Sequence, residues 1–229
     1  MKKYILIFFI YAIAGWIMES TMISIKNKKF VNRGFLIGPI CPIYGYGVVL
    51  ITVVLKKYQD DIVVTFFMSI IICGVLEYLT SFFMEKIFNA RWWDYSKRKF
   101  NINGRICLEN LVLFGIASCF IVYIVNPFIM QKIELIPEFV QNIVIVVLLL
   151  IHLIDNIVSY KIILNLKRVS NEIEDNTIEI SEKVRKIIHN KSIFHRRLIN
   201  AFPDIKEKVK FKKWTVKEKL NKLKDDMKK

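Results

Sequence analysis

The chain has 229 residues, of which 54% are hydrophobic, and it carries a formal net charge of +15. This combination describes a polytopic membrane protein with a basic portion outside the bilayer. The four cysteines lack C-x-x-C spacing, which argues against a disulfide framework or a zinc site. We therefore expect no metal and no cofactor, and the position of the basic residues, described below, argues against a nucleic-acid partner.

Five apolar stretches reach the roughly 20 residues that a spanning helix needs. The first also imitates a secretory signal peptide, but its apolar sequence continues to Ile25, so we expect a retained helix rather than cleavage. The sequence thus predicts an all-α bundle of five transmembrane helices. The predicted spans are residues 4–25, 37–55, 62–84, 108–129 and 139–160, and residues 1–160 form the predicted membrane domain.

The beginning of the second span is rich in helix breakers. Within residues 34–47, the chain contains four glycines as well as Pro39 and Pro42. Proline removes a backbone donor and clashes with the preceding turn, whereas glycine frees the backbone. We therefore expect an irregular entrance to this span. Because lipid excludes exposed non-helical backbone, neighbouring helices must cover this segment or it must lie at the membrane edge.

Several polar residues lie where a bilayer disfavours them, since a charged residue near its centre costs about 2.5–3.5 kcal/mol on insertion scales. Glu77, Ser81 and Glu85 follow one another at i, i+4 and i+8, so they share one face of the third span. With Glu19 and Arg105, they converge on one end of the bundle and predict a polar, inward-facing cavity beside the broken segment. The candidate substrate-binding residues are Glu19, Arg33, Gly38, Pro39, Pro42, Tyr44, Glu77, Ser81, Glu85 and Arg105.

The same residues also permit a structural interpretation. Glu19 with Arg33, and Glu85 with Arg91, could be ion pairs that pin helix ends in the headgroup zone. Glu77 lies deepest and is the best candidate for contact with a substrate or a proton. In the fifth span, His152, Asp155, Asn156 and Ser159 recur at spacings of three and four, which fits either a proton relay or a hydrogen-bonded structural group.

The loop "NARWWDYSKRKFNINGR" at 89–105 joins the third and fourth spans. Its aromatic residues Trp92, Trp93 and Tyr95 precede a basic cluster, which is typical of a segment at the membrane interface. Alternatively, this loop caps the cavity, with Arg91 paired to Asp94.

The distribution of Lys and Arg predicts the orientation. Ten of them follow the first and third spans, on one side of the predicted bundle, and five lie on the opposite side. The tail is left out of both counts. The basic side is predicted to be cytoplasmic. We expect a multi-pass protein of the plasma membrane (the inner membrane of a cell with two), with its N-terminus outside and its C-terminus in the cytoplasm.

The tail, residues 161–229, contains 20 Lys or Arg and 10 Asp or Glu. An apolar seam at spacings of three and four runs through 162–187 and predicts a helix that continues the fifth span. This seam could form a homodimer or fold back on its own chain. A second amphipathic stretch contains Trp214 opposite a lysine-rich face, which suits an anionic lipid surface or packing on the first helix.

Four segments of the chain are similar to those of the ABC-transporter type IV permease family, also called the CmpB family. They are "GWIMES" at 15–20, "NRGFLIGPICPIYGYG" at 32–47, "LEYLTSFFMEKIFNARWWDYS" at 76–96 and "NINGRICLEN" at 101–110. "RRLINAFP" at 196–203 is also similar to the tails of this family. The resemblance implies a small integral membrane transport permease, but the family provides no established substrate or catalytic residues to transfer.

Three functions fit these observations. The first is a transport subunit whose polar cavity binds a small polar or cationic substrate; because the chain lacks a P-loop, its ATPase would be a separate subunit. The second is a membrane scaffold or regulator acting through its tail. The third is an intramembrane enzyme in which Glu77, or His152 with Asp155, supplies acid or base catalysis on a lipid-linked substrate. Zincin, serine-hydrolase and dinucleotide-binding motifs are absent, and we name no catalytic residue.

Overall fold

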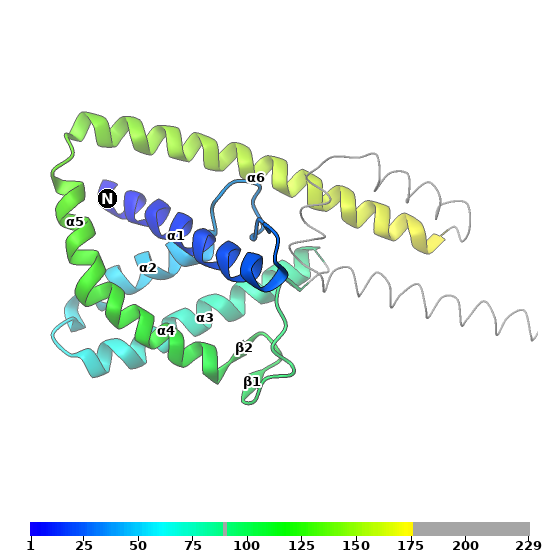
Figure 1. The fold of residues 1–229 in the computed structure, drawn as a ribbon, viewed down its shortest axis with the longest axis horizontal. Coiled ribbons are helices and arrows are strands. Elements are labelled where there is room, and N and C mark those ends of the chain that lie inside the picture. The colour runs from blue at the N-terminus through cyan, green and yellow to red at the C-terminus, as the bar shows by residue number, and fades with distance from the viewer. Residues whose placement is uncertain (89–90, 176–229) are drawn as a thin grey trace, which may run out of the picture.

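A computed structural model describes residues 1–88 and 91–175, with side chains up to 162. This part of the chain is predominantly helical, and its long helices are arranged side by side (Figure 1). The elements in chain order are α1 (Lys2–Asn27), α2 (Pro42–Val54), the 3-10 turn η1 (Leu55–Tyr58), α3 (Ile62–Phe88), β1 (Asn101–Ile102), β2 (Ile106–Cys107), α4 (Leu108–Phe120), the π-helical turn η2 (Ile121–Val125), α5 (Asn126–Glu134) and α6 (Glu138–Asp175).

Four helical stretches in the described residues are long and apolar enough to cross a bilayer. Three are α1, α3 and the part of α6 from Glu138 to Ile162, and the fourth is the continuous stretch Leu108–Glu134 formed by α4, η2 and α5. This last stretch contains Pro127. Proline lacks the amide that a regular helix requires and clashes with the preceding turn, and the π-helical turn just before it accommodates this defect.

The predicted second span differs from the other four. Its helix, α2, begins at Pro42 rather than at 37 and has only 13 residues, about 20 Å at 1.5 Å per residue, which is short of the hydrocarbon thickness. The expected irregular entrance is present: no helix covers the segment from Lys28 to Cys41. The structure therefore describes four long helical spans and one short helix preceded by irregular backbone, in place of five long helices.

The irregular segment, residues 28–41, runs back along α1. It leaves α1 at Lys28, which has a left-handed φ of 50°, and its last residue, Cys41, donates its backbone N–H to the carbonyl of Ala12 at 2.9 Å. Since Ala12 lies in the middle of α1, α2 starts halfway along that helix and then packs antiparallel to it. Figure 1 shows this segment lying between α1 and α6, so protein covers two sides of its backbone.

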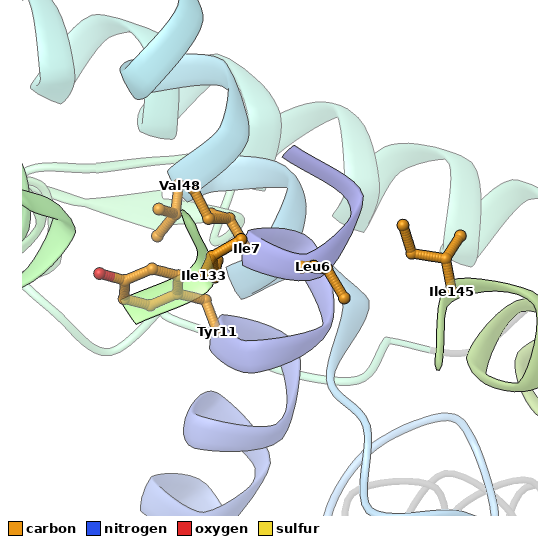
Figure 2. Close-up of a cluster of buried hydrophobic side chains, with 6 residues drawn as sticks. All are labelled: Leu6, Ile7, Tyr11, Val48, Ile133 and Ile145. Carbon is orange, nitrogen blue, oxygen red and sulfur yellow. The ribbon is translucent and has the colours of Figure 1, made fainter. Parts of the chain in front are cut away.

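Small apolar clusters, rather than one large core, hold the helices together. In one of them, Leu6, Ile7 and Tyr11 of α1 meet Val48 of α2, Ile133 of α5 and Ile145 of α6 (Figure 2). Many large apolar side chains are exposed on the outer faces of the four long stretches. Such an outer surface is appropriate for contact with acyl chains.

The described part of the loop after α3 contains a small antiparallel hairpin, in which Ile102 pairs with Ile106. Its turn includes Asn103 and Gly104, both with positive φ. The hairpin lies at the same end of the molecule as the C-terminal end of α1 (Figure 1). The opposite end is marked by the ion pairs Lys2–Glu138 and Lys3–Glu134. The two ends that the sequence predicted are therefore separate surfaces of the fold.

Candidate functional site

The irregular segment is held by side chains from α6 and α1. Asp155 accepts hydrogen bonds from the backbone N–H groups of Ile37 and Gly38, both at 2.9 Å, and from the hydroxyl of Ser159 at 3.0 Å. A Cβ atom on Gly38 would lie 2.8 Å from a carboxylate oxygen of Asp155. Glycine at this position thus permits the close approach of carboxylate and backbone, and we call this arrangement the Asp155 clamp.

A second contact fixes the other side of the segment. Asn32 donates from its amide to the carbonyl of Ile37 at 2.9 Å and accepts from the indole N–H of Trp16 at 2.7 Å. The segment is therefore connected to α1 through Trp16 and to α6 through Asp155.

Glu19 of α1 lies beside this segment and is fully engaged by its neighbours. The hydroxyl of Tyr44 donates to Oε1 of Glu19 at 2.8 Å. Arg33 forms an ion pair with Oε2 at 3.4 Å. The predicted pair of Glu19 with Arg33 is thus present, and Tyr44 joins it because Gly15 leaves room for the Tyr44 ring: a Cβ atom on Gly15 would overlap that ring.

Glu77 of α3 has a different environment. Its side chain is only 6% exposed, and its Oε1 accepts a hydrogen bond from the hydroxyl of Tyr95 at 3.2 Å. Its Oε2 is buried and has no hydrogen-bond partner among the described residues. Glu77 and Glu19 are close enough to repel each other electrostatically. Burial raises the pKa of the Tyr95 phenol above its usual range, and the Glu77 carboxylate raises it further, so Tyr95 remains a proton donor.

Glu85, about two turns beyond Glu77 in α3, belongs to an ion-pair network. Arg91 donates from Nε to both oxygens of Glu85 at 2.9 Å, and Arg105 approaches Oε2 at 2.8 Å. Arg105 also donates to the hydroxyl of Ser81 at 3.3 Å. This network joins α3 to the loop after it, as the pinning interpretation of Glu85 predicted. Arg91 additionally pairs with Asp94 at 3.8 Å, the contact expected for a loop that caps the site.

The structure thus brings the candidate residues together in unequal roles. Glu19, Tyr44 and Arg33 form one group, Glu77 with Tyr95 a second, and Ser81, Glu85 and Arg105 a third. Gly38 belongs to the Asp155 clamp, Pro42 begins α2 in its first turn, and Pro39 lies within the irregular segment.

The aromatic residues of the loop face different surroundings. Trp92 is 5% exposed and packs with Val31 and Phe88. Its ring thus contacts protein, and its position at the level of the headgroups stays a prediction. Trp93 is half-buried and donates from its indole N–H to the carbonyl of Arg105 at 3.0 Å. Trp214 lies outside the described residues, as does the part of the predicted 162–187 seam beyond residue 175.

A second buried polar chain was not anticipated from the sequence. Asn126 accepts from the Tyr11 hydroxyl at 2.8 Å and donates to the Thr52 hydroxyl at 2.7 Å, which connects α1, α2 and α5. The signal available was an asparagine next to Pro127 within an apolar span. The predicted group on α6 is also split: Asp155 and Ser159 hold the irregular segment, whereas Asn156 hydrogen-bonds His152 within the helix.

Two chemical properties follow from this arrangement. Within the part of the chain that the structure describes, no group of three or more His, Cys, Asp or Glu residues could hold a metal ion. A surface hollow of about 370 Å³ lies at the other end of the molecule, beside Lys2 and Glu134. Glu77 is covered by protein in this conformation, which we call the closed form, whereas the side chains of Glu19 and Glu85 are 32% and 29% exposed.

Long apolar helices with an interrupted segment are typical of a helical membrane protein, and in this one Glu77 is buried. The chain belongs to the family described as "Putative ABC-transporter type IV", whose family model matches residues 6–160. That range includes all the grouped residues above. No curated protein and no solved structure matches the chain. The family and the apolar helices indicate a transporter-related membrane protein.

Proposed function

We propose that the chain is the membrane subunit of an ABC-type transporter and that Glu19 and Glu77 form part of its substrate site. The substrate is a small polar or cationic molecule. It enters between α1, α3 and the irregular segment from the basic end of the bundle, which we assign to the cytoplasm. The ATPase is a separate subunit, because this chain carries no P-loop.

The observation that carries this proposal is the free oxygen of Glu77. Native proteins rarely leave a buried polar atom without a partner, and each such atom calls for an explanation. Charged groups inside a membrane domain are costly and commonly mark the route of an ion or substrate. Glu77 is an acid with a buried oxygen that has no partner among the described residues, whereas Glu19 and Glu85 pair with arginines.

The position of Glu77 beside a broken segment supports the same function. Transporters often bind their substrates where a helix is interrupted, because freed backbone groups become available there. In this chain α2 begins halfway along α1, and the preceding segment is held by a few hydrogen bonds, to Asp155, within the segment through Asn32, and to two serines of α1. Release of these few bonds would open the region next to Glu19 and Tyr44.

The test begins with affinity purification of the tagged full-length chain in mild detergent. The expected result is co-purification of a P-loop ATPase, identified by mass spectrometry, in fixed proportion to the chain. Recovery of only a peptidase, a sensor or an envelope-synthesis enzyme would refute the transport function. Uptake of labelled small polar and cationic solutes is then compared between cells carrying the original chain and Glu77→Gln. We expect uptake to be lost at unchanged membrane abundance.

A matched control separates a specific effect of Glu77 from a general effect of removing one negative charge from the chain. Glu109 lies at the start of α4, is 60% exposed at its side chain, and pairs with Arg98. Glu109→Gln removes the same charge from an exposed position and should leave uptake unchanged. Equal loss in both variants would contradict a specific role for Glu77.

The continuous α6 favours a second candidate function, a scaffold acting through the tail. This helix extends to Asp175, well past the apolar stretch that ends at Ile162. A scaffold would keep its activity in Glu77→Gln and lose it when the tail, residues 161–229, is removed. The transport function predicts the opposite result: Glu77→Gln abolishes activity, and removal of the tail has the smaller effect.

A further inference from the structure

The three acids at the basic end of the bundle differ in how their oxygens are used. Both oxygens of Glu19 are occupied, one by Tyr44 and the other by Arg33. Both oxygens of Glu85 accept from Arg91, and one also from Arg105. Oε2 of Glu77 alone among these six oxygens is buried with no partner in the described residues.

An ionised carboxylate in this position would be strongly disfavoured. A buried charge without a paired countercharge loses its hydration, and such groups neutralise instead. No described cation pairs with Glu77, while Glu19 adds a like charge nearby. The donor on the occupied oxygen is a neutral phenol, Tyr95.

A bound metal ion is a poor countercharge for an ionised Glu77. Hard cations require several oxygen ligands, and the oxygens of Glu19 are already committed to Tyr44 and Arg33. Within residues 1–88 and 91–162, no cluster of three metal-ligating acids, histidines or cysteines exists. A single free carboxylate oxygen in a closed, protein-covered position is appropriate for a proton.

We propose that Glu77 binds one exchangeable proton on Oε2 in the closed form, and that opening of the site toward the basic end releases this proton. The inference deepens the proposed function at the same site, since it names a species that the site binds. Hydration of Glu77 on opening would allow its carboxyl group to ionise at neutral pH. Acidification therefore favours the closed form, and each opening at neutral pH releases one proton per chain.

The groups around Glu77 determine how this proton is held. Tyr95 donates to Oε1 and leaves Oε2 as the place for the proton. Arg33 pairs with Glu19 and Arg105 pairs with Glu85, so neither arginine takes the place of the proton on Glu77. The titratable groups that face the site are Glu19 from α1, Tyr44 from α2, Cys73 from α3, and Tyr95 and Cys107 from the loop before α4.

Infrared spectroscopy tests this proposal directly. The full-length chain is placed in nanodiscs of phosphatidylethanolamine and phosphatidylglycerol, without substrate or ATPase, and the C=O band of protonated carboxylic acids is recorded at neutral pH. We expect this band in the original chain and in the exposed-acid control Glu109→Gln, and its loss in Glu77→Gln. Tyr95→Phe should shift the band to higher frequency, because the C=O group loses its hydrogen-bond donor.

Two results would overturn the proposal. One is the absence of a protonated band at neutral pH, or its persistence in Glu77→Gln. The other is a band that appears only after Na⁺ and K⁺ are removed, which would show that Oε2 binds a metal cation. The Tyr95→Phe shift remains informative if Glu77→Gln folds poorly. Since these spectra need no transport, their failure leaves the co-purification and uptake tests of the proposed function unaffected.

Discussion

The Asp155 clamp provides the sharpest test of how the irregular segment is stabilised. Asp155→Asn keeps the size and shape of the side chain but replaces one carboxylate oxygen with an amide that donates. In the structure, Oδ1 accepts from Ile37 and Ser159, and Oδ2 accepts from Gly38. The variant therefore leaves at least one backbone N–H facing a donor instead of an acceptor.

The expected cost follows from the number of bonds lost. A hydrogen bond to a charged group contributes roughly 1.5–3 kcal/mol, and a buried donor left unsatisfied costs about 1–3 kcal/mol. Asp155→Asn should therefore lower the free energy of unfolding by about 2–4 kcal/mol. Asp155→Ala removes both acceptors and should cost more. Gly38→Ala should have a related effect, since its Cβ would lie 2.8 Å from Oδ2 and displace the carboxylate.

Unfolding in mixed micelles of dodecyl maltoside and increasing dodecyl sulfate, followed by tryptophan fluorescence, measures these differences. Glu138→Gln is the control on the same helix, because its side chain is 77% exposed and its pair with Lys2 is at the surface, where ion pairs contribute little to stability. Limited proteolysis should also cut residues 28–41 faster in Asp155→Asn. Equal stability of Asp155→Asn and Glu138→Gln would refute the clamp.

Three further substitutions test the packing and the ion pairs. Glu85→Gln should lower the free energy of unfolding by about 1–3 kcal/mol, because two arginines lose a partially buried partner; unchanged unfolding would show that the network is not stabilising. Gly15→Ala should lower the melting temperature by displacing Tyr44, whereas Gly47→Ala, whose Cβ would lie 3.7 Å from its nearest neighbour, should not. Asn126→Leu should cost about 1–3 kcal/mol in mixed-micelle unfolding by leaving two buried hydroxyls without this partner, and a neutral effect would contradict that buried chain.

The sequence contained enough information to predict the irregular backbone and the ends of the molecule. Pro39, Pro42 and the surrounding glycines are incompatible with a regular helix, and that local property does not depend on the rest of the fold. The Glu85–Arg91 pair was also predictable, since its members are close in sequence and oppositely charged. The length of α2 was not, because the sequence between 37 and 55 is apolar throughout and hydropathy alone does not locate the helix start.

Long-range partners were harder to predict for a physical reason. Asp155 and Gly38 are 117 residues apart, and their contact depends on how α6 crosses the irregular segment. The sequence placed Asp155 with His152 because the two share a helix face. Backbone amides have no residue-specific signal in a sequence, so a carboxylate that binds them resembles one without a partner. In the same way, nothing in the sequence indicated that the Trp92 ring is buried against Val31 and Phe88.

The irregular segment also explains why so many polar residues gather at one end of the bundle. Irregular backbone inside a membrane needs side-chain partners for its amides. Ser24 accepts from the N–H of Val31 at 2.9 Å, Ser20 accepts from Arg33 at 3.1 Å, and Asp155 accepts from the amides at 37 and 38.

These contacts divide the polar residues by task. The serines of α1 and the aspartate of α6 satisfy the backbone of the irregular segment, and Glu85 binds the arginines of the loop after α3. Glu77 takes part in neither, since among the described residues its one hydrogen-bond partner is the phenol of Tyr95 and its other oxygen is buried without a partner. If the cost of burying Glu77 served only stability, an apolar residue of similar size would serve it better. The buried carboxyl of Glu77 is therefore the group on which the proposed binding of a proton and of a substrate depends.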